Sequence, residues 1–328
     1  MYTAPQRFRE RFGAQFKENE PLSRHLNFRV GGPARYFLEV RSGADLEAGV
    51  KMANDLAIDW VVLGGGSNTL ASDEGYLGLV IKIAFREVKI EGDRLVVEAG
   101  AITASVARQA SEQGLTGLEW AISLPGTIGG AVRGNAGCFG GEISDHLLAV
   151  TVLHNGVIEQ WEKEKLEFSY RHSILKDKDY KQTIVVVAEF QLAPADPKRC
   201  VAKLSDFLQQ RKLTQPFGTS SAGCVFVNVE NFTEVQLQRI LKVTIVPAKM
   251  LQAHRLGAGW LIEQAGFKGT RVGQAEVSLS HGNFLVNLGQ ARASEISQLI
   301  KLIKRGIYEK FGIRLQEELN LIGLNLEI

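Results

Sequence analysis

The chain has 328 residues, of which 45% are hydrophobic and 23% are charged, and its formal net charge is +2. This length exceeds one ordinary core and predicts two or three domains of a globular protein without disordered bias. Basic and acidic residues are interspersed and no apolar run is long enough for a membrane span. We therefore expect no nucleic-acid partner and a cytoplasmic, non-membrane protein.

The first third of the chain reads as a strand, a glycine loop and another strand. An extended segment, NFRVGGPARYFLEV, precedes a helix predicted over residues 44–56 with Ser42 as its N-cap. The strand DWVVLG then runs into GGGSN at residues 64–68, and the apolar run LGLVIKIA follows a short acidic loop.

Residues 94–193 predict a second α+β unit, in which the strands RLVVEAG, AVTVLHNG and TIVVVAEFQLA alternate with the helix ITASVARQASEQG. A long glycine-rich passage occupies residues 117–141. After a boundary near residue 195 we expect a helix over 198–212. A later amphipathic helix has Ser294 as its expected N-cap and an apolar stripe, and the strand IRLQEELNLIGLNL ends the chain. The stripe comprises Ile296, Leu299, Ile300, Ile303 and Ile307.

Two glycine-rich loops are the strongest chemical signal. Glycine lets backbone N–H groups approach an anion closely, so VLGGGSN and LPGTIGGAVRGNAGCFGG could each cradle a phosphate, although a single loop of this kind is more often a tight turn. Neither loop is a Walker sequence or a GxGxxG fingerprint. The two loops together suggest a dinucleotide with a pyrophosphate.

Cysteine and histidine offer no metal or disulfide framework. The three cysteines are widely spaced and the six histidines are scattered, so we expect reduced thiols and no metal. Cys138 and Cys200 read as packing residues. Cys224 follows SSAG and precedes an apolar run, a position that packing alone would also allow.

The order of motifs VGGPA, LGGGSN, SDEG, GLEWAISLPGTIGGAVRGNAG, YRHSI, SAGC, GWLIEQAGFKG and LQEELNLIG resembles the UDP-N-acetylenolpyruvoylglucosamine reductase (MurB) family over residues 27–323. The resemblance implies an α+β fold with a two-subdomain FAD-binding module of the vanillyl-alcohol oxidase type and a C-terminal α+β substrate-binding domain. We expect the two FAD-binding subdomains at 1–90 and 91–197, the latter joined by the strand 313–328, and the substrate-binding domain at 198–312.

The family resemblance implies non-covalent FAD as cofactor and NADPH as its reductant. Reduced FAD would pass hydride from N5 to C3 of UDP-N-acetylglucosamine enolpyruvate, giving UDP-N-acetylmuramate for peptidoglycan synthesis. The pyrophosphate would lie on the first loop and the flavin along the second. The implied FAD-binding residues are Gly64, Gly65, Gly66, Ser67, Asn68, Pro125, Gly126, Thr127, Gly129, Gly130, Asn135 and Gly137.

Three residues match the family's catalytic positions. Arg171 in YRHSI matches the catalytic arginine, whose fork can bind a carboxylate at two points. Glu318 matches the catalytic glutamate, and Glu317 stands where proline is common. Because neighbours in a strand face opposite sides, only one of this pair can point into the site. Cys224 stands where many members have the serine that protonates C2, and a neutral thiol can serve as that acid.

The chain departs from the family pattern after Cys224. Asn228 is retained as a substrate-binding candidate, but the usual lysine is Val227 and the usual proline is Val229. Lys212, Lys268 or Arg271 could supply a replacement cation, and residues 229–256 suggest an added helical insert. Tyr170 and His281 are further candidates for lining the substrate site, although Tyr170 could equally be structural.

Two alternative functions remain at the level of sequence. A flavin oxidase of the same fold would often tether its flavin to histidine, but no histidine lies in residues 59–72 or 124–139. A non-catalytic paralogue that binds FAD or a UDP-sugar would not need Arg171 and Glu318, both of which are present. We therefore favour the reductase, and expect a monomer.

Overall fold

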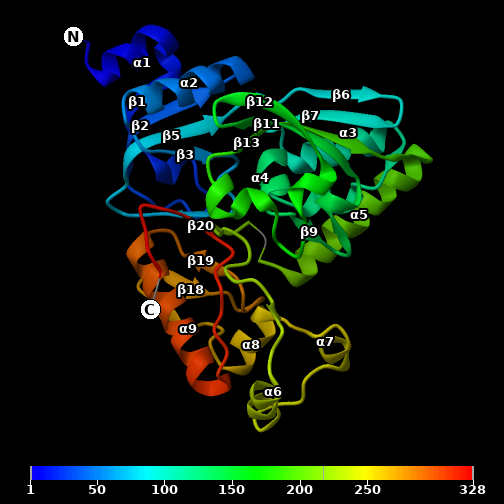
Figure 1. The fold of residues 1–328 in the computed structure, drawn as a ribbon. Coiled ribbons are helices and arrows are strands. Elements are labelled where there is room, and N and C mark those ends of the chain that lie inside the picture. The colour runs from blue at the N-terminus through cyan, green and yellow to red at the C-terminus, as the bar shows by residue number, and fades with distance from the viewer. Residues whose placement is uncertain (1, 217, 327–328) are drawn as a thin grey trace. The chain divides into compact units, whose positions relative to one another are not determined.

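The computed structural model describes residues 2–216 and 218–326, which divide into two compact units (Figure 1). The first unit takes in the chain up to Glu20, residues 34–65 and residues 77–213, and the second takes in residues 21–33, residues 66–76 and the chain from Thr214 onward. Both units mix helices and strands, as expected for an α+β chain.

The first unit holds two main sheets. A four-stranded sheet has the order β1-β2-β5-β3, with β3 and β5 parallel, and an antiparallel five-stranded sheet has the order β12-β11-β13-β7-β6. The elements are α1 (Ala4–Phe12), β1 (Phe16–Pro21), β2 (Pro33–Val40), α2 (Gly43–Asp55), β3 (Trp60–Leu63), β5 (Tyr76–Ile83), β6 (Val88–Glu91), β7 (Arg94–Glu98), α3 (Thr103–Glu112), β8 (Leu115–Thr116), α4 (Ile128–Arg133), β9 (Gly137–Cys138), β10 (Gly141–Glu142), β11 (Leu147–His154), β12 (Val157–Glu162), β13 (Ile184–Gln191), β14 (Ala193–Pro194) and α5 (Pro197–Thr214).

The second unit has smaller sheets around one long helix. Strands β17, β18 and β19 form an antiparallel sheet against which α9 packs, and β20 pairs in parallel with β4 (Figure 1). Its elements are β4 (Thr69–Ala71), β15 (Val229–Glu230), α6 (Glu234–Leu241), α7 (Ala248–Gln252), β16 (Arg255–Leu256), α8 (Ala258–Gln264), β17 (Arg271–Val272), β18 (Ala275–Val277), β19 (Leu285–Asn287), α9 (Ala293–Phe311) and β20 (Asn320–Ile322).

Each unit has a separate apolar core. In the first, side chains of α2, α3 and α4 cover the sheets, and in the second the predicted stripe of α9 is fully buried. Burial of such side chains is the main stabilising contribution to a fold of this kind. The predicted helix after Ser42 is confirmed, because the Ser42 hydroxyl accepts a hydrogen bond from the Asp45 N–H at 3.1 Å.

The units differ from the expected domain ranges in three respects. Segments 21–33 and 66–76 belong with the C-terminal half of the chain, and so does the described part of the tail that was expected to join residues 91–197. The physical reason is strand pairing, since Asn320, Leu321 and Ile322 pair with Thr69, Leu70 and Ala71 of β4. The helix α5, expected to open the substrate-binding domain at residue 198, instead belongs to the first unit up to Leu213. Residues 1, 217, 327 and 328 of the predicted ranges lie outside the described residues.

The expected cap of α9 was wrong. Arg292 is the N-cap and Ser294 is the second residue of the helix. The carboxylate of Asp73 accepts from the N–H groups of Ala293 at 2.7 Å and Ser294 at 2.9 Å, so the first turn is capped from the loop after β4. A cap supplied by a residue so distant in the sequence has no local signal.

Asp73→Ala is expected to lower the free energy of unfolding by about 1 kcal/mol at pH 7, the usual effect of losing a helix cap. Burial alone would raise the pKa of Asp73, but the N–H groups of Ser294 and Ala293 outweigh it and the pKa is lowered. This stabilisation is therefore complete above the ordinary value of 3.8 and is lost as the pH falls through the lowered pKa. Urea unfolding from about pH 7 down to about pH 2, which covers the carboxyl titration range, should show the stability difference between the two proteins shrinking in acid. A constant difference would contradict this role.

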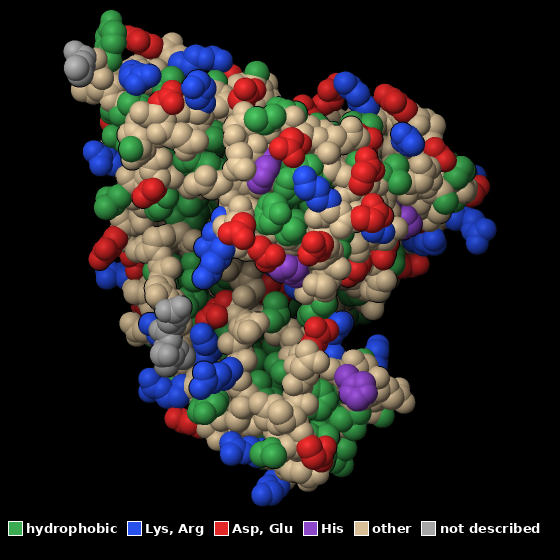
Figure 2. Space-filling view, viewed as in Figure 1, with side chains coloured by type: hydrophobic (Ala, Val, Ile, Leu, Met, Phe, Trp, Pro, Cys, Tyr) green, Lys and Arg blue, Asp and Glu red, His purple; other side chains and the backbone are tan. Residues whose placement is uncertain are grey.

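Charged side chains of both signs are interspersed over both units on the face shown in Figure 2. None of the described helices is both long enough and apolar enough to cross a membrane.

Candidate functional site

The first glycine loop begins where β3 ends and passes close to a second stretch of backbone. A Cβ atom built on Gly64 would lie 2.5 Å from the Thr127 hydroxyl oxygen, and one on Gly65 would lie 2.9 Å from the Cα of Gly126. Side chains are thus excluded where the two predicted glycine loops meet. Neither the Gly65 nor the Gly66 N–H donates a hydrogen bond to another described residue. The loop therefore offers backbone N–H donors of the kind that bind phosphate oxygens.

The other predicted FAD residues lie in the second loop, before, within and after the helix α4. Pro125, Gly126 and Thr127 precede α4, Gly129 and Gly130 lie within it, and Asn135 and Gly137 follow it. Asn135 is fully buried with a positive φ of 40°, and its side-chain amide donates to the Ser169 carbonyl at 3.0 Å and accepts from the Ser144 N–H at 3.1 Å. Asn135 is therefore a structural link between this loop and the YRHSI segment.

Arg171 lies at the tip of a tight turn closed by two backbone hydrogen bonds between Ser169 and His172, each 3.1 Å. Its backbone has a left-handed φ of 56°, and its guanidinium donates to the carbonyl of Gly137. The Lys176 ammonium binds the Arg171 carbonyl at 2.6 Å, and the guanidinium lies 5.1 Å from the centre of the Tyr170 ring. The structure thus brings Arg171, Tyr170 and the second glycine loop together within the first unit.

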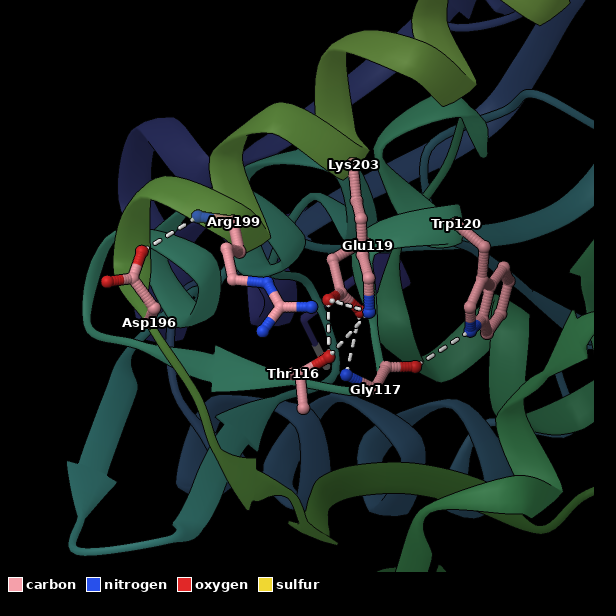
Figure 3. Close-up of polar contacts among 7 residues, drawn as sticks. All are labelled: Thr116, Gly117, Glu119, Trp120, Asp196, Arg199 and Lys203. Carbon is pink, nitrogen blue, oxygen red and sulfur yellow. Dashed lines mark hydrogen bonds and ion pairs between the residues drawn. The ribbon is translucent and has the colours of Figure 1, made fainter.

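A buried carboxylate organises the start of the second loop, and sequence reasoning missed it. Glu119, only 4% exposed, accepts from the Thr116 hydroxyl and from the Gly117 N–H at 2.7 Å, and the Lys203 ammonium of α5 lies 3.4 Å away (Figure 3). Burial alone would raise the pKa of Glu119, but these donors and Lys203 lower it. The Glu-Trp pair inside a glycine-rich passage was the available signal, since a polar residue there needs partners.

Trp120 and Ser123 extend this support to Cys138. The Trp120 indole N–H donates to the Gly117 carbonyl at 3.0 Å (Figure 3). Its ring fills the space beside Gly141, where an added Cβ would lie 2.3 Å from it. Cys138 lies 3.2 Å from the Ser123 hydroxyl and burial raises its pKa, and burial likewise raises the pKa of Cys200 in α5. Both thiols pack as expected, although Cys138 is only partly buried.

In the second unit, Cys224 opens a short extended segment placed between two others. Its backbone bridges to Phe284 on one side, while Val225 and Val227 exchange hydrogen bonds with residues 316–318 on the other. The Glu318 N–H donates to the Val225 carbonyl at 2.8 Å, one residue from Cys224. Cys224 and Glu318 are therefore held on neighbouring backbone segments.

Asn283 ties this arrangement together and was not found from the sequence. Its side-chain amide accepts from the Phe226 N–H at 2.9 Å and donates to the Phe226 carbonyl at 2.7 Å, and it is only 3% exposed. The amide thus substitutes for a neighbouring strand on that side of Phe226. Its position two residues after His281, in SHGN, was the only available signal.

His281 lies next to this amide. The Asn283 N–H donates to its Nδ1 at 3.2 Å, and its ring meets the Phe284 ring edge to face at 4.9 Å. Burial, followed by the nearby Lys268 ammonium, lowers the pKa of His281. The ring is therefore neutral at pH 7, and because Nδ1 accepts a hydrogen bond, Nε2 carries the proton and can donate.

The two adjacent glutamates have different surroundings. Glu317 forms an ion pair with Lys304 of α9 at 2.6 Å, whereas the Glu318 carbonyl accepts from the Asn68 side chain at 3.0 Å. The Asn68 carbonyl in turn accepts from the Asn320 N–H at 2.9 Å. The first glycine loop is thereby joined to the backbone that carries Glu318.

The residues after Cys224 serve local structure. The Asn228 side chain accepts from the Ala258 N–H at 3.0 Å at the start of α8, so at least this oxygen has a structural role. The expected helices of the 229–256 insert are confirmed as α6 and α7, and the pairing of β15 with β16 closes its base. Val227 stands where the family commonly has lysine, and three cations were suggested as replacements. Two of them form ion pairs, Lys268 with Glu263 at 2.8 Å and Arg271 with Glu276.

Gly65→Ala is expected to weaken FAD binding at least about tenfold, because its methyl group would press on the backbone of Gly126, which cannot move like a side chain. FAD titration of the apoprotein by fluorescence measures this. Gly43→Ala is the matched control, since its Cβ would meet only the Val186 side chain at 3.4 Å, an ordinary contact. Equal FAD affinity in the two variants would contradict a close FAD contact at Gly65.

Comparison with known proteins agrees with this geometry. The family model described as "FAD binding domain" matches residues 34–158, and that described as "UDP-N-acetylenolpyruvoylglucosamine reductase, C-terminal domain" matches residues 215–322. A reductase of that name from Chloroflexus aggregans is 39% identical over 93% of this chain and 97% of its own length. One from Caldicellulosiruptor bescii is 37% identical over 95% of this chain and 92% of its own.

A solved structure supports the same assignment. UDP-N-acetylenolpyruvylglucosamine reductase from Thermus caldophilus matches with a TM-score of 0.74 and 32% identity, covering 93% of this chain and 98% of that one. The fold is that of an FAD-containing oxidoreductase with a separate C-terminal domain, as expected. The chain belongs to the UDP-N-acetylenolpyruvoylglucosamine reductase (MurB) family.

Proposed function

We propose that this chain catalyses the NADPH-dependent reduction of UDP-N-acetylglucosamine enolpyruvate to UDP-N-acetylmuramate through bound FAD, a step of peptidoglycan precursor synthesis. Family membership at 39% identity over nearly the whole chain is the observation that carries the proposal. We further propose that the enzyme acts in the cytoplasm as a monomer.

The residues present fit FAD. Gly64 and Gly65 lie so close to the Thr127 side chain and the Gly126 backbone that neither has room for a side chain, and the N–H groups of Gly65 and Gly66 are left to bind the pyrophosphate. The passage from Pro125 to Gly137 would border the flavin. Held by residues 64–66 and 125–137, FAD would supply hydride transfer, with NADPH as the hydride source and C3 of the enolpyruvyl ether as the acceptor. The protein then has to stabilise the negative charge that develops on the substrate and to supply the proton that C2 accepts.

Arg171 is proposed to bind the substrate carboxylate and to stabilise the negative charge that develops as C3 accepts hydride. The backbone of Arg171 is held in place by the tight turn between Ser169 and His172 and by the contact of Lys176 with its carbonyl. Its side chain therefore starts from a fixed position. This rigidity lowers the cost of reorganisation when charge develops. Tyr170, whose ring lies beside the guanidinium, is proposed as a substrate neighbour.

Cys224 is proposed to donate the proton to C2, with its thiolate regaining a proton from solvent afterwards. Glu318 is the proposed catalytic glutamate, held one residue away across the backbone pairing with Val225. The neutral His281, with its Nε2 proton, and Asn228, through its side-chain N–H groups, are proposed to donate hydrogen bonds to the substrate.

The test follows NADPH oxidation by the purified holoenzyme with and without UDP-N-acetylglucosamine enolpyruvate. A rate that depends on this acceptor supports the reductase. Turnover that consumes oxygen and ignores the acceptor would indicate an oxidase, and a protein that binds FAD or UDP-sugar without turnover would indicate a non-catalytic paralogue. Either result overturns the proposal.

A further inference from the structure

Glu318 lies in the segment 313–319. One polar side chain of this segment, that of Glu317, lies on the face directed toward the core of the second unit. Ile313, Leu315 and Leu319 are at most 7% exposed and belong to that core, while Arg314 and Gln316 between them are exposed. In an extended chain alternate side chains share a face, so Glu317 falls on the core side and Glu318 on the opposite side.

Lys304 supplies the partner that Glu317 needs on that side. Its ammonium lies 2.6 Å from the Glu317 carboxylate and 3.4 Å from the Leu326 carbonyl, and both charged side chains are 18% exposed. Breaking a half-buried ion pair on one side leaves a costly unpaired charge. The ion pair therefore disfavours any pairing register of residues 313–319 in which Glu317 no longer faces Lys304.

A shift of one residue would exchange the faces of the two glutamates. Burial of Ile313, Leu315 and Leu319 opposes such a shift, but backbone pairing adds little within the segment. The ladder between residues 225–227 and 316–318 is a single bridge between Phe226 and Glu317, and the pairing of residues 320–322 with β4 lies beyond the segment. We propose that the Lys304–Glu317 ion pair is a positioning device that fixes the register of residues 313–319 and so presents Glu318 to the substrate. This inference rests on the proposed function, in which Glu318 is catalytic.

The hydrogen bonding of this segment also suggests a substitution that should fix its register without the ion pair. The bridge uses the N–H groups of Val227 and Glu318, whereas the Glu317 N–H donates to no other described residue. Proline at 317 therefore loses no hydrogen bond, stiffens the extended chain and removes the carboxylate that Lys304 neutralises. Lys304→Met combined with Glu317→Pro should hold the segment without the ion pair.

The test separates the two half-reactions by stopped-flow absorbance of the flavin in the holoenzyme. Lys304→Met is expected to slow oxidation of the reduced flavin by the enolpyruvyl substrate about tenfold, because small misplacement of a catalytic group has large effects on rate. Reduction of the flavin by NADPH should stay within about twofold. Lys304→Met/Glu317→Pro is expected to regain the wild-type rate within about threefold.

Lys310→Met is the matched control, because Lys310 lies on the same helix and, among the described residues, its ammonium contacts the Gln264 carbonyl and the face of Phe311 alone. Equal slowing of both half-reactions by Lys304→Met, unchanged rates, or no rescue by proline would each overturn the inference. If Lys304→Met proves too unstable for kinetics, Glu317→Gln must show the same selective loss. Absence of acceptor-dependent turnover in the wild-type protein would instead refute the proposed function.

Discussion

Cys224→Ala is expected to slow the substrate half-reaction by about 10³-fold, the range typical for loss of a general acid, and to leave flavin reduction by NADPH within about twofold. The proton reaches C2 only in the second half-reaction, so only that step should respond. The backbone of Cys224 is held by its bridge to Phe284, which does not involve the thiol. The change should therefore remove the acid without moving the segment.

Cys224→Ser is the matched control, because a hydroxyl keeps a proton at nearly the same place. It should retain the substrate half-reaction within about tenfold, as a serine hydroxyl is the weaker acid of the two. Rapid mixing of the reduced enzyme with substrate measures both variants. If alanine slowed both half-reactions equally, or serine were as slow as alanine, Cys224 would not be the proton donor.

The parts of the fold that follow from periodicity could be predicted from the sequence. The apolar stripe of α9 appears at helical spacing and is fully buried, and the N-cap of α2 is three residues from the N–H that it binds. Both signals are local. The family could also be predicted, because its motifs lie in the same order along nearly the whole chain.

The parts that depend on distant contacts could not be predicted. Asp73 caps a helix about 220 positions further along the chain, and Asn283 pairs with the backbone of Phe226, so neither has a signal in its own neighbourhood. The assignment of residues 66–76 to the second unit has the same cause, since β4 pairs with β20 near the other end of the chain.

The same limit applies to the candidate site. The sequence identified the adjacent Glu317 and Glu318 and predicted that only one could face the substrate. It could not show that Lys304 pairs with the first of them. The ion pair is what distinguishes the two glutamates, and it joins positions on two separate elements of the second unit.

Arg171→Met is expected to slow the substrate half-reaction by about 10³-fold or more, because an oriented guanidinium that stabilises developing charge typically contributes this much. Arg171→Lys should still lose about 10²-fold, since an ammonium keeps the charge but not the two-point geometry. Both replacements must adopt the same left-handed φ of 56°, so backbone strain is matched and the difference between them reports on the head group.

Stopped-flow measurement of both half-reactions checks this result, with flavin absorbance as evidence that FAD is retained. Arg199→Met is the control, because Arg199 is an exposed arginine at the start of α5, and both half-reactions should be unchanged. Loss of the Arg171 contact with the Gly137 carbonyl could instead displace the loop beside the flavin. In that case reduction by NADPH would slow as well, and a lysine variant as fast as the wild type would exclude two-point binding of the carboxylate.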